Sequence, residues 1–327
     1  MRRVLLWLSC LVYCLMSLAE ERMPLVLETK IPLGDVKGRI DHLAIDVDGQ
    51  RLFVAALGSN SVEVVDLSSR KAARSLTGLE EPQGIAYVSR TQMLYVAGGG
   101  DGSVHVFRGL DLTPVTSVKL GKDADNIRID RERQQLYVGY GDGALAVIDQ
   151  ATHRKVADLP LKAHPESFQL ENAGTRIFVN VPDANEIAVV DRRTNRQVAS
   201  WPTKDLHANY PLALDEANQR VLSVFRRPAT LAIFRLPDGA LLNRIAICGD
   251  ADDIFVDAKR ALVYVSCGEG FVDVLSSRDN AYSRIARVKT TAGARTALFS
   301  AEMDRLFLAA RAGSDGPAAI WVFRPSE

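Results

Sequence analysis

Seven short apolar runs recur along the chain, and a bulky residue stands in the middle of each run. The middle residues are Phe53, Tyr95, Tyr137, Phe178, Leu222, Tyr264 and Phe307, six of them aromatic. The intervals between them are 42, 42, 41, 44, 42 and 43 residues. A period of this length built from strand-like segments is typical of a β-propeller, in which each repeat forms one blade.

The third repeat shows how one blade is built. Segments at 126–130, 136–139, 144–149 and 156–161 are separated by turn-forming residues, which predicts four short antiparallel strands. The second segment is apolar at successive positions, as in a strand buried on both faces. We therefore predict an all-β fold, a seven-bladed β-propeller with blades at about 40–78, 82–121, 123–163, 164–204, 205–249, 250–293 and 294–327.

The seventh repeat lacks a fourth strand, and the missing strand is found near the other end of the chain. The segment 25–34 resembles the fourth strands at 115–121 and 156–162, with Pro32 in the place of Pro160. Proline suits an outermost strand because it has no N–H to donate to a further neighbour. We predict that 25–34 completes the last blade and closes the ring.

The first 19 residues have the pattern of a secretory signal peptide. A basic start at Arg2 and Arg3 precedes the apolar stretch 4–18, and small residues end the segment before Glu20. An uncleaved membrane anchor is the alternative, although the stretch is short for a full span. We expect a periplasmic or secreted protein with one domain at 20–327 and no membrane span after cleavage.

The charge balance argues against a nucleic-acid partner. The full sequence has 40 Lys and Arg against 40 Asp and Glu, and loss of residues 1–19 removes two arginines. The mature chain would then carry a charge near −2, whereas nucleic-acid binders have a basic excess. The arginine pairs 192–193 and 226–227 are interpreted as solvated loop residues rather than anion sites. We expect a monomer.

Two of the four cysteines fall in the predicted signal peptide. The other two, Cys248 and Cys267, lie near the sixth blade, and export would permit a disulfide between them. Two separate buried thiols remain the alternative, because the sequence does not give the Cα separation that a bridge requires.

Loops on one face of the ring carry the unusual polar residues. In a propeller the crossings between blades lead into the innermost strands and line the mouth of the central channel, where a ligand site is expected. A solvated mouth without a ligand, or a protein-binding surface elsewhere, are the alternatives. The predicted ligand-binding residues are His42, Gln83, Asn126, Glu166, His207, Tyr210, Asp253 and Arg295.

A divalent metal is a narrower hypothesis for the same face. His42, His207, Asp253 and Glu166 are suitable ligand types, but they come from four different blades and no local spacing brings them together. The glycine-rich segments 98–102 and 139–143 each join two strands, so they are not phosphate loops. No cofactor other than this ion is suggested, and no catalytic residue is identified.

The Leu-Tyr/Phe-Val runs followed by strands such as Val62-Glu63-Val64-Val65-Asp66 resemble the YVTN β-propeller family, and within it the exported YncE-like members. The resemblance covers the mature chain and implies the fold. It implies a binding, surface or undefined role. Relatives of the same architecture include metal-dependent lactonases and lyases, quinone-linked enzymes and accessory proteins of quinoprotein pathways.

From these observations we predict an exported binding or scaffold protein that holds a small molecule or a partner's loop at the mouth, and we favour this role over that of an enzyme. The alternatives are a metal-dependent lactonase- or lyase-like enzyme and an accessory protein of a periplasmic quinoprotein pathway.

Overall fold

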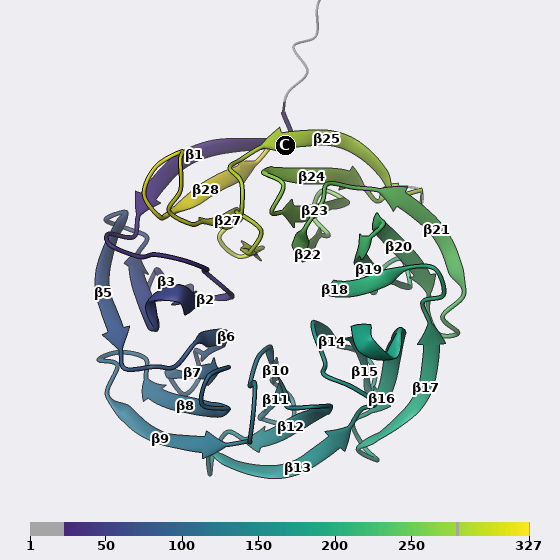
Figure 1. The fold of residues 1–327 in the computed structure, drawn as a ribbon, viewed down its shortest axis with the longest axis horizontal. Helices are drawn as coiled ribbons and strands as arrows, with labels where there is room; N and C mark the ends of the chain where they lie inside the picture. Colours follow the sequence, from purple (N-terminus) through teal and green to yellow (C-terminus); the bar gives the residue numbers. More distant parts are fainter. Residues whose placement is uncertain (1–22, 279–280, 327) are drawn as a thin grey trace, which may run out of the picture.

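The fold is described from a computed structural model, which covers residues 23–278 and 281–326. The predicted signal peptide, 1–19, lies outside the described residues. Seven sheets of four antiparallel strands form a ring around a central channel (Figure 1). The predicted seven-bladed propeller is therefore confirmed. Among the described residues, no helix is both long and apolar enough to cross a membrane.

In blades 1 to 6 the four strands run outward from the channel in chain order. Blade 1 comprises β2 (Leu43–Asp46), β3 (Arg51–Ala56), β4 (Ser61–Asp66) and β5 (Lys71–Thr77). Blade 2 comprises β6 (Pro82–Val88), β7 (Met93–Gly98), β8 (Ser103–Arg108) and β9 (Pro114–Lys119). Blade 3 comprises β10 (Ile127–Asp130), β11 (Gln135–Tyr140), β12 (Ala144–Asp149) and β13 (Arg154–Pro160). Blades 4 and 5 comprise β14 (Phe168–Leu170), β15 (Arg176–Val181), β16 (Glu186–Asp191) and β17 (Arg196–Pro202); and β18 (His207–Asp215), β19 (Arg220–Arg227), β20 (Ala229–Arg235) and β21 (Leu241–Ala246). Blade 6 comprises β22 (Ala251–Asp257), β23 (Leu262–Cys267), β24 (Phe271–Ser276) and β25 (Ser283–Lys289). Short 3₁₀ helices, η1 (Leu57–Ser59) and η2 (Pro182–Ala184), follow β3 and β15.

Blade 7 joins the two ends of the chain, as predicted. It contains β26 (Ala297–Ser300), β27 (Arg305–Ala310) and β28 (Ala319–Pro325), and β1 (Leu25–Pro32) pairs antiparallel with β28 as its outermost strand. Next to this ladder, the Ser326 N–H donates to Pro24 O at 2.9 Å. The Arg305 guanidinium also pairs with Glu28 at 2.6 Å. These contacts close the ring.

The core is divided into seven apolar clusters, each shared by two neighbouring blades. Tyr95 of β7 and Leu136 of β11, for example, belong to one cluster and are both fully buried. Each blade is thus covered on both faces, which explains the successive apolar residues of its second strand. Burial of these clusters is the main stabilising contribution that the sequence makes to the ring.

The interpretation of the two arginine pairs as solvated loop residues is wrong for one residue of each pair, Arg192 and Arg226. Arg192 is buried at the blade 3–blade 4 junction, where its Nη1 pairs with Asp130 Oδ2 at 2.5 Å. Its Nη2 donates to the carbonyls of Glu171 and Gly174, both at 2.6 Å. Arg193 next to it is exposed. Arg226 lies in the cavity described below.

Candidate functional site

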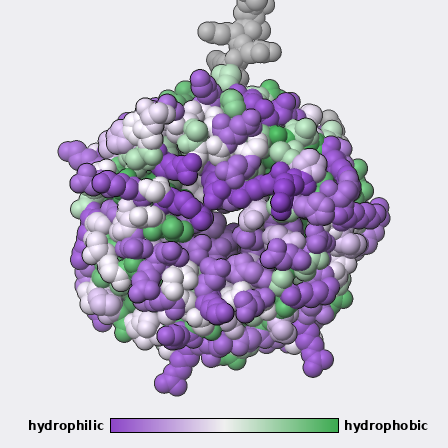
Figure 2. Space-filling model, viewed as in Figure 1, coloured by the Kyte–Doolittle hydropathy of each residue, from purple (hydrophilic) through white to green (hydrophobic). Residues whose placement is uncertain are grey.

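A cavity of about 250 Å³ lies where the inter-blade crossings meet at the channel mouth. Figure 2 shows hydrophilic residues around the opening at the centre of the ring. Seven of the lining residues occupy equivalent positions, one in each blade. In every blade the middle residue of the second strand pairs with a residue of the first strand, and the lining residue lies three positions before that partner. We call them the mouth ring: Asp41, Gln83, Asp125, Glu166, Tyr210, Asp252 and Arg295.

Backbone hydrogen bonds fix the mouth ring. The Asp41 N–H donates to Ala55 O at 2.7 Å, and the Ala55 N–H donates to His42 O at 3.0 Å. The same reciprocal pair joins Asp125 and Asn126 to Gly139, at 2.9 and 3.0 Å. In blades 1 and 3 the crossing therefore extends the antiparallel ladder of its blade, so its side chains are held on a rigid frame.

Arginines neutralise one side of the mouth. Arg226 pairs with Asp252, and its guanidinium lies 4.0 Å from the ring centroid of Tyr210. Arg295 Nε also contacts Asp252 Oδ2, at 2.9 Å. On blade 1, Arg39 Nη2 donates to Asp41 Oδ2 at 2.9 Å. Each of these arginines already has a carboxylate partner, which offsets the attraction that its charge would have for an anionic ligand.

The opposite side of the mouth carries a buried carboxylate, Asp125, and a partly buried one, Glu166, neither of which has an arginine partner. Asp125 is 8% exposed, and its Oδ1 has no hydrogen-bond partner. Burial, together with the charges of Asp41 and Glu166, raises the pKa of Asp125 well above its usual range. Burial also raises the pKa of Glu166 to about 7, against the lowering effect of His164. A positive charge bound here would relieve both carboxylates.

His42 lies between two of the carboxylates. Its Nε2 is 3.6 Å from Asp41 Oδ1 and 3.8 Å from Asp125 Oδ1. Burial lowers the pKa of His42 to about 4, and the nearby Arg128 charge lowers it further. The imidazole is therefore neutral near pH 7. Within the described ranges, Asp41, His42 and Asp125 form the one group of metal-ligating side chains whose ligand atoms all lie within 4.8 Å of one another.

Six of the eight predicted site residues line this cavity: His42, Gln83, Asn126, Glu166, Tyr210 and Arg295. The other two do not line it. His207 is exposed at the start of β18, with Nδ1 2.9 Å from Asn185 Oδ1. Asp253 is turned away, and its Oδ2 accepts the Ala297 N–H at 2.8 Å. The predicted metal set of His42, His207, Asp253 and Glu166 is therefore not brought together.

The error at Asp253 is a shift of one residue. In blade 6 the mouth-ring position is Asp252, which lies at a register irregularity between Ala251 and Asp253, whereas Asp253 is already paired with Ser266. The prediction likewise named His42 and Asn126 but omitted the residues that precede them, Asp41 and Asp125, which also line the cavity. Counting back from the aromatic of each second strand would have found all three, because the repeat gives that register.

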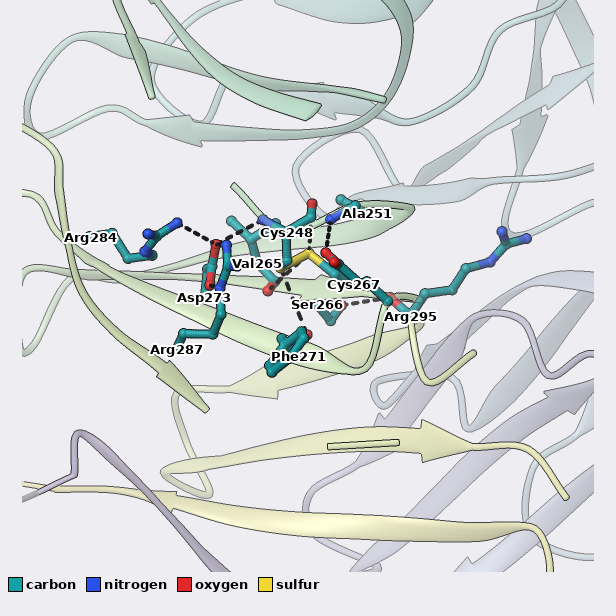
Figure 3. Close-up of a disulfide and its surroundings, with 12 residues drawn as sticks. Cys248, Ala251, Val265, Ser266, Cys267, Phe271, Asp273, Arg284, Arg287 and Arg295 are labelled. Atoms are coloured by element: carbon teal, nitrogen blue, oxygen red, sulfur yellow. Dashed lines mark hydrogen bonds and ion pairs between the residues drawn. A yellow bond between two sulfur atoms is a disulfide. The ribbon is translucent and has the colours of Figure 1, made fainter. Parts of the chain in front are cut away.

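The structure joins Cys248 and Cys267 in a disulfide, with the Cα atoms 5.8 Å apart (Figure 3). The bridge ties the crossing into blade 6 to the end of β23. The Cys248 N–H donates to the buried Asp273 Oδ2 at 2.9 Å. The neighbouring Ser266 Oγ donates to Arg295 O at 2.6 Å, so this strand also supports the crossing that carries a mouth-ring residue.

Comparison with known proteins supports the fold and goes no further. No family model matches the chain, and no curated protein matches it. Among solved structures, Kuenenia stuttgartiensis hydrazine synthase is similar with a TM-score of 0.73 at 17% identity, over 91% of this chain and 96% of that one. A mitotic checkpoint complex structure gives 0.78 at 13% identity, over 100% of this chain and 99% of that one. The class defined by fold and site is a β-propeller with a polar mouth, and YVTN membership stays a prediction.

Proposed function

We propose that this chain is an exported β-propeller of the YVTN type that binds a small cationic ligand at the mouth ring. Export is supported by the signal-like segment 1–19 and by the disulfide, which persists in oxidising compartments. A rigid scaffold with convergent polar side chains is the usual setting of a ligand site.

The observation that carries this proposal is the surplus of carboxylates. Five carboxylates but only three arginines line the cavity. Each of these arginines is already paired with an aspartate. Asp125 and Glu166 remain without an arginine partner in a partly buried setting, where charges interact more strongly than in water. A cation is therefore the favoured occupant.

The volume limits the size of the ligand. About 250 Å³ lies just below the range of roughly 300–1,000 Å³ that is typical of pockets for drug-sized molecules. The site suits a small amine or an ion better than a cofactor. The alternatives of a metal-dependent lactonase- or lyase-like enzyme and of a quinoprotein-pathway accessory protein rest on the family resemblance alone.

A thermal-shift experiment tests the proposal with named probes. Putrescine and choline serve as cations, and glucose and citrate as neutral and anionic controls of similar size. We expect the cations to raise the melting temperature of the native protein, since a ligand bound to the folded state stabilises it. The rise should shrink in Glu166→Gln and persist in Asp205→Asn, a surface carboxylate outside the cavity. The proposal of a cation site at the mouth would be refuted if citrate raised the melting temperature as much as the cations do. It would also be refuted if the cations raised the melting temperature equally in Glu166→Gln and Asp205→Asn.

A further inference from the structure

We propose that Asp41, His42 and Asp125 bind one divalent transition-metal ion at the channel mouth. The inference rests on the proposed function, because it specifies the cation for the same cavity. Two ligands come from the crossing into blade 1 and the third from the crossing into blade 3, so the site is assembled by the packing of separate blades.

The distances suit one shared ion. Atoms bound to the same ion at about 2.0–2.4 Å lie at most about 4–4.8 Å apart. The three ligand atoms satisfy this limit, since all lie within 4.8 Å of one another. The 3.6 and 3.8 Å separations of His42 Nε2 from the two carboxylates are too long for hydrogen bonds. The groups therefore converge without satisfying one another.

Each carboxylate has one oxygen held by a neighbour and the other directed to the site. Arg39 occupies Asp41 Oδ2 at 2.9 Å, and Asn126 Nδ2 donates to Asp125 Oδ2 at 3.3 Å. The Oδ1 atoms of both aspartates are the ones that approach His42. Outer partners of this kind orient the ligands in metal sites.

Unsatisfied oxygens provide independent support. Asn126 lines the cavity and is 2% exposed, yet its Oδ1 has no hydrogen-bond partner, and neither has Asp125 Oδ1. Buried polar atoms are rarely left unpaired in native proteins. An ion would satisfy Asp125 Oδ1 directly, and the amide oxygen of Asn126 is available as a further ligand.

The donor set indicates the class of ion. Two carboxylate oxygens and one imidazole nitrogen form a donor set that favours first-row transition metals over Mg²⁺ or Ca²⁺. We therefore expect Mn²⁺ and Zn²⁺ to bind and the hard ions to bind more weakly.

The test uses the full-length mature protein after EDTA treatment and dialysis. Isothermal titration with Zn²⁺ and Mn²⁺, with elemental analysis of the dialysed complex, should give one ion per chain. The variants Asp125→Asn and His42→Gln should each weaken binding at least tenfold. Asp205→Asn and His207→Gln, which change an exposed carboxylate and an exposed histidine outside the cavity, should leave it unchanged. Melting temperatures of the ion-free variants check folding, and a misfolded Asp125→Asn would be replaced by Asp125→Ser.

The inference is overturned if the native protein binds neither ion. It is also overturned if His42→Gln and the Asp125 variant bind as tightly as the native protein, or if Asp205→Asn weakens binding equally, which would indicate general acidic attraction. The two proposals can fail separately. Stabilisation by putrescine without ion binding would leave the cationic pocket standing, and ion binding with no response to organic cations would leave only the metal site.

Discussion

Replacing Arg192 by methionine should destabilise the ring by about 3–5 kcal/mol, the usual cost of breaking a buried ion pair by removing one partner. Both side chains are enclosed, at 4% exposure for Arg192 and 3% for Asp130. Asp130 would keep Arg133, whose N–H donates to it at 2.9 Å. The carbonyls of Glu171 and Gly174 would lose their donor, at about 1–3 kcal/mol for each group left unpaired.

The assay is urea unfolding followed by circular dichroism, with a parallel thermal melt. For a chain of this length we expect the melting temperature to fall by about 5–7 °C if the ring unfolds cooperatively. Arg193→Met is the matched control, because Arg193 has a side-chain exposure of 70%. In this control variant the free energy of unfolding should change by no more than about 0.5 kcal/mol.

The pH dependence provides a second readout for the same pair. Burial would raise the pKa of Asp130, but the Arg133 N–H and the Arg192 charge outweigh it, so the pKa is lowered. A carboxyl with a lowered pKa stabilises the folded state above its unfolded pKa, and this contribution is lost as the pH falls through the folded pKa. The difference in free energy of unfolding between the native protein and Arg192→Met should therefore become smaller at acidic pH. A loss below about 1 kcal/mol at pH 7, or an equal loss in Arg193→Met, would refute the reasoning.

Three further predictions concern ring closure, the mouth and the disulfide. Deleting 20–36 should abolish cooperative unfolding, because β28 would lose its partner β1; a sharp native-like melt in the deletion protein would contradict this. In ion-free protein, Glu166→Gln should be more stable than the native chain at pH 8 by about 2–3 kcal/mol, and the gap should close toward pH 4.5. The sign follows because the folded pKa is raised to about 7, so the native state binds more protons and loses stability as the pH rises; a gap independent of pH in urea titrations would refute it. The double variant Cys248→Ser, Cys267→Ser should lose about 3 kcal/mol in the same assay for a loop of 19 residues, with dithiothreitol giving the same loss in the native protein only.

The repeat made most of the fold predictable from the sequence. Apolar runs around residues such as Tyr95 and Tyr137 repeat because each second strand is packed between two blades, and Pro32 marked the strand that closes the ring. The site was less predictable because it depends on register. One residue decides whether a carboxylate faces the channel, like Asp252, or the neighbouring backbone, like Asp253.

Distance in the sequence explains the remaining omissions. Asp41 and Asp125 are 84 residues apart, and no local motif connects them. Arg192 resembled its solvated neighbour Arg193 because both sit in one polar turn, and only the position of Asp130 in another blade distinguishes them. Such contacts follow from the closed ring, which a single repeat does not display.

Pairing of β1 with β28 imposes an order on folding. Strand β1 cannot pair until β28 is present, so six complete blades form an open arc while β1 has no partner. The apolar clusters on either side of blade 7 stay incomplete over that interval, leaving surface exposed to self-association. The channel mouth also remains unformed, since Arg295 enters it from the final blade. Binding competence should therefore arise in one late step, when β28 pairs with β1.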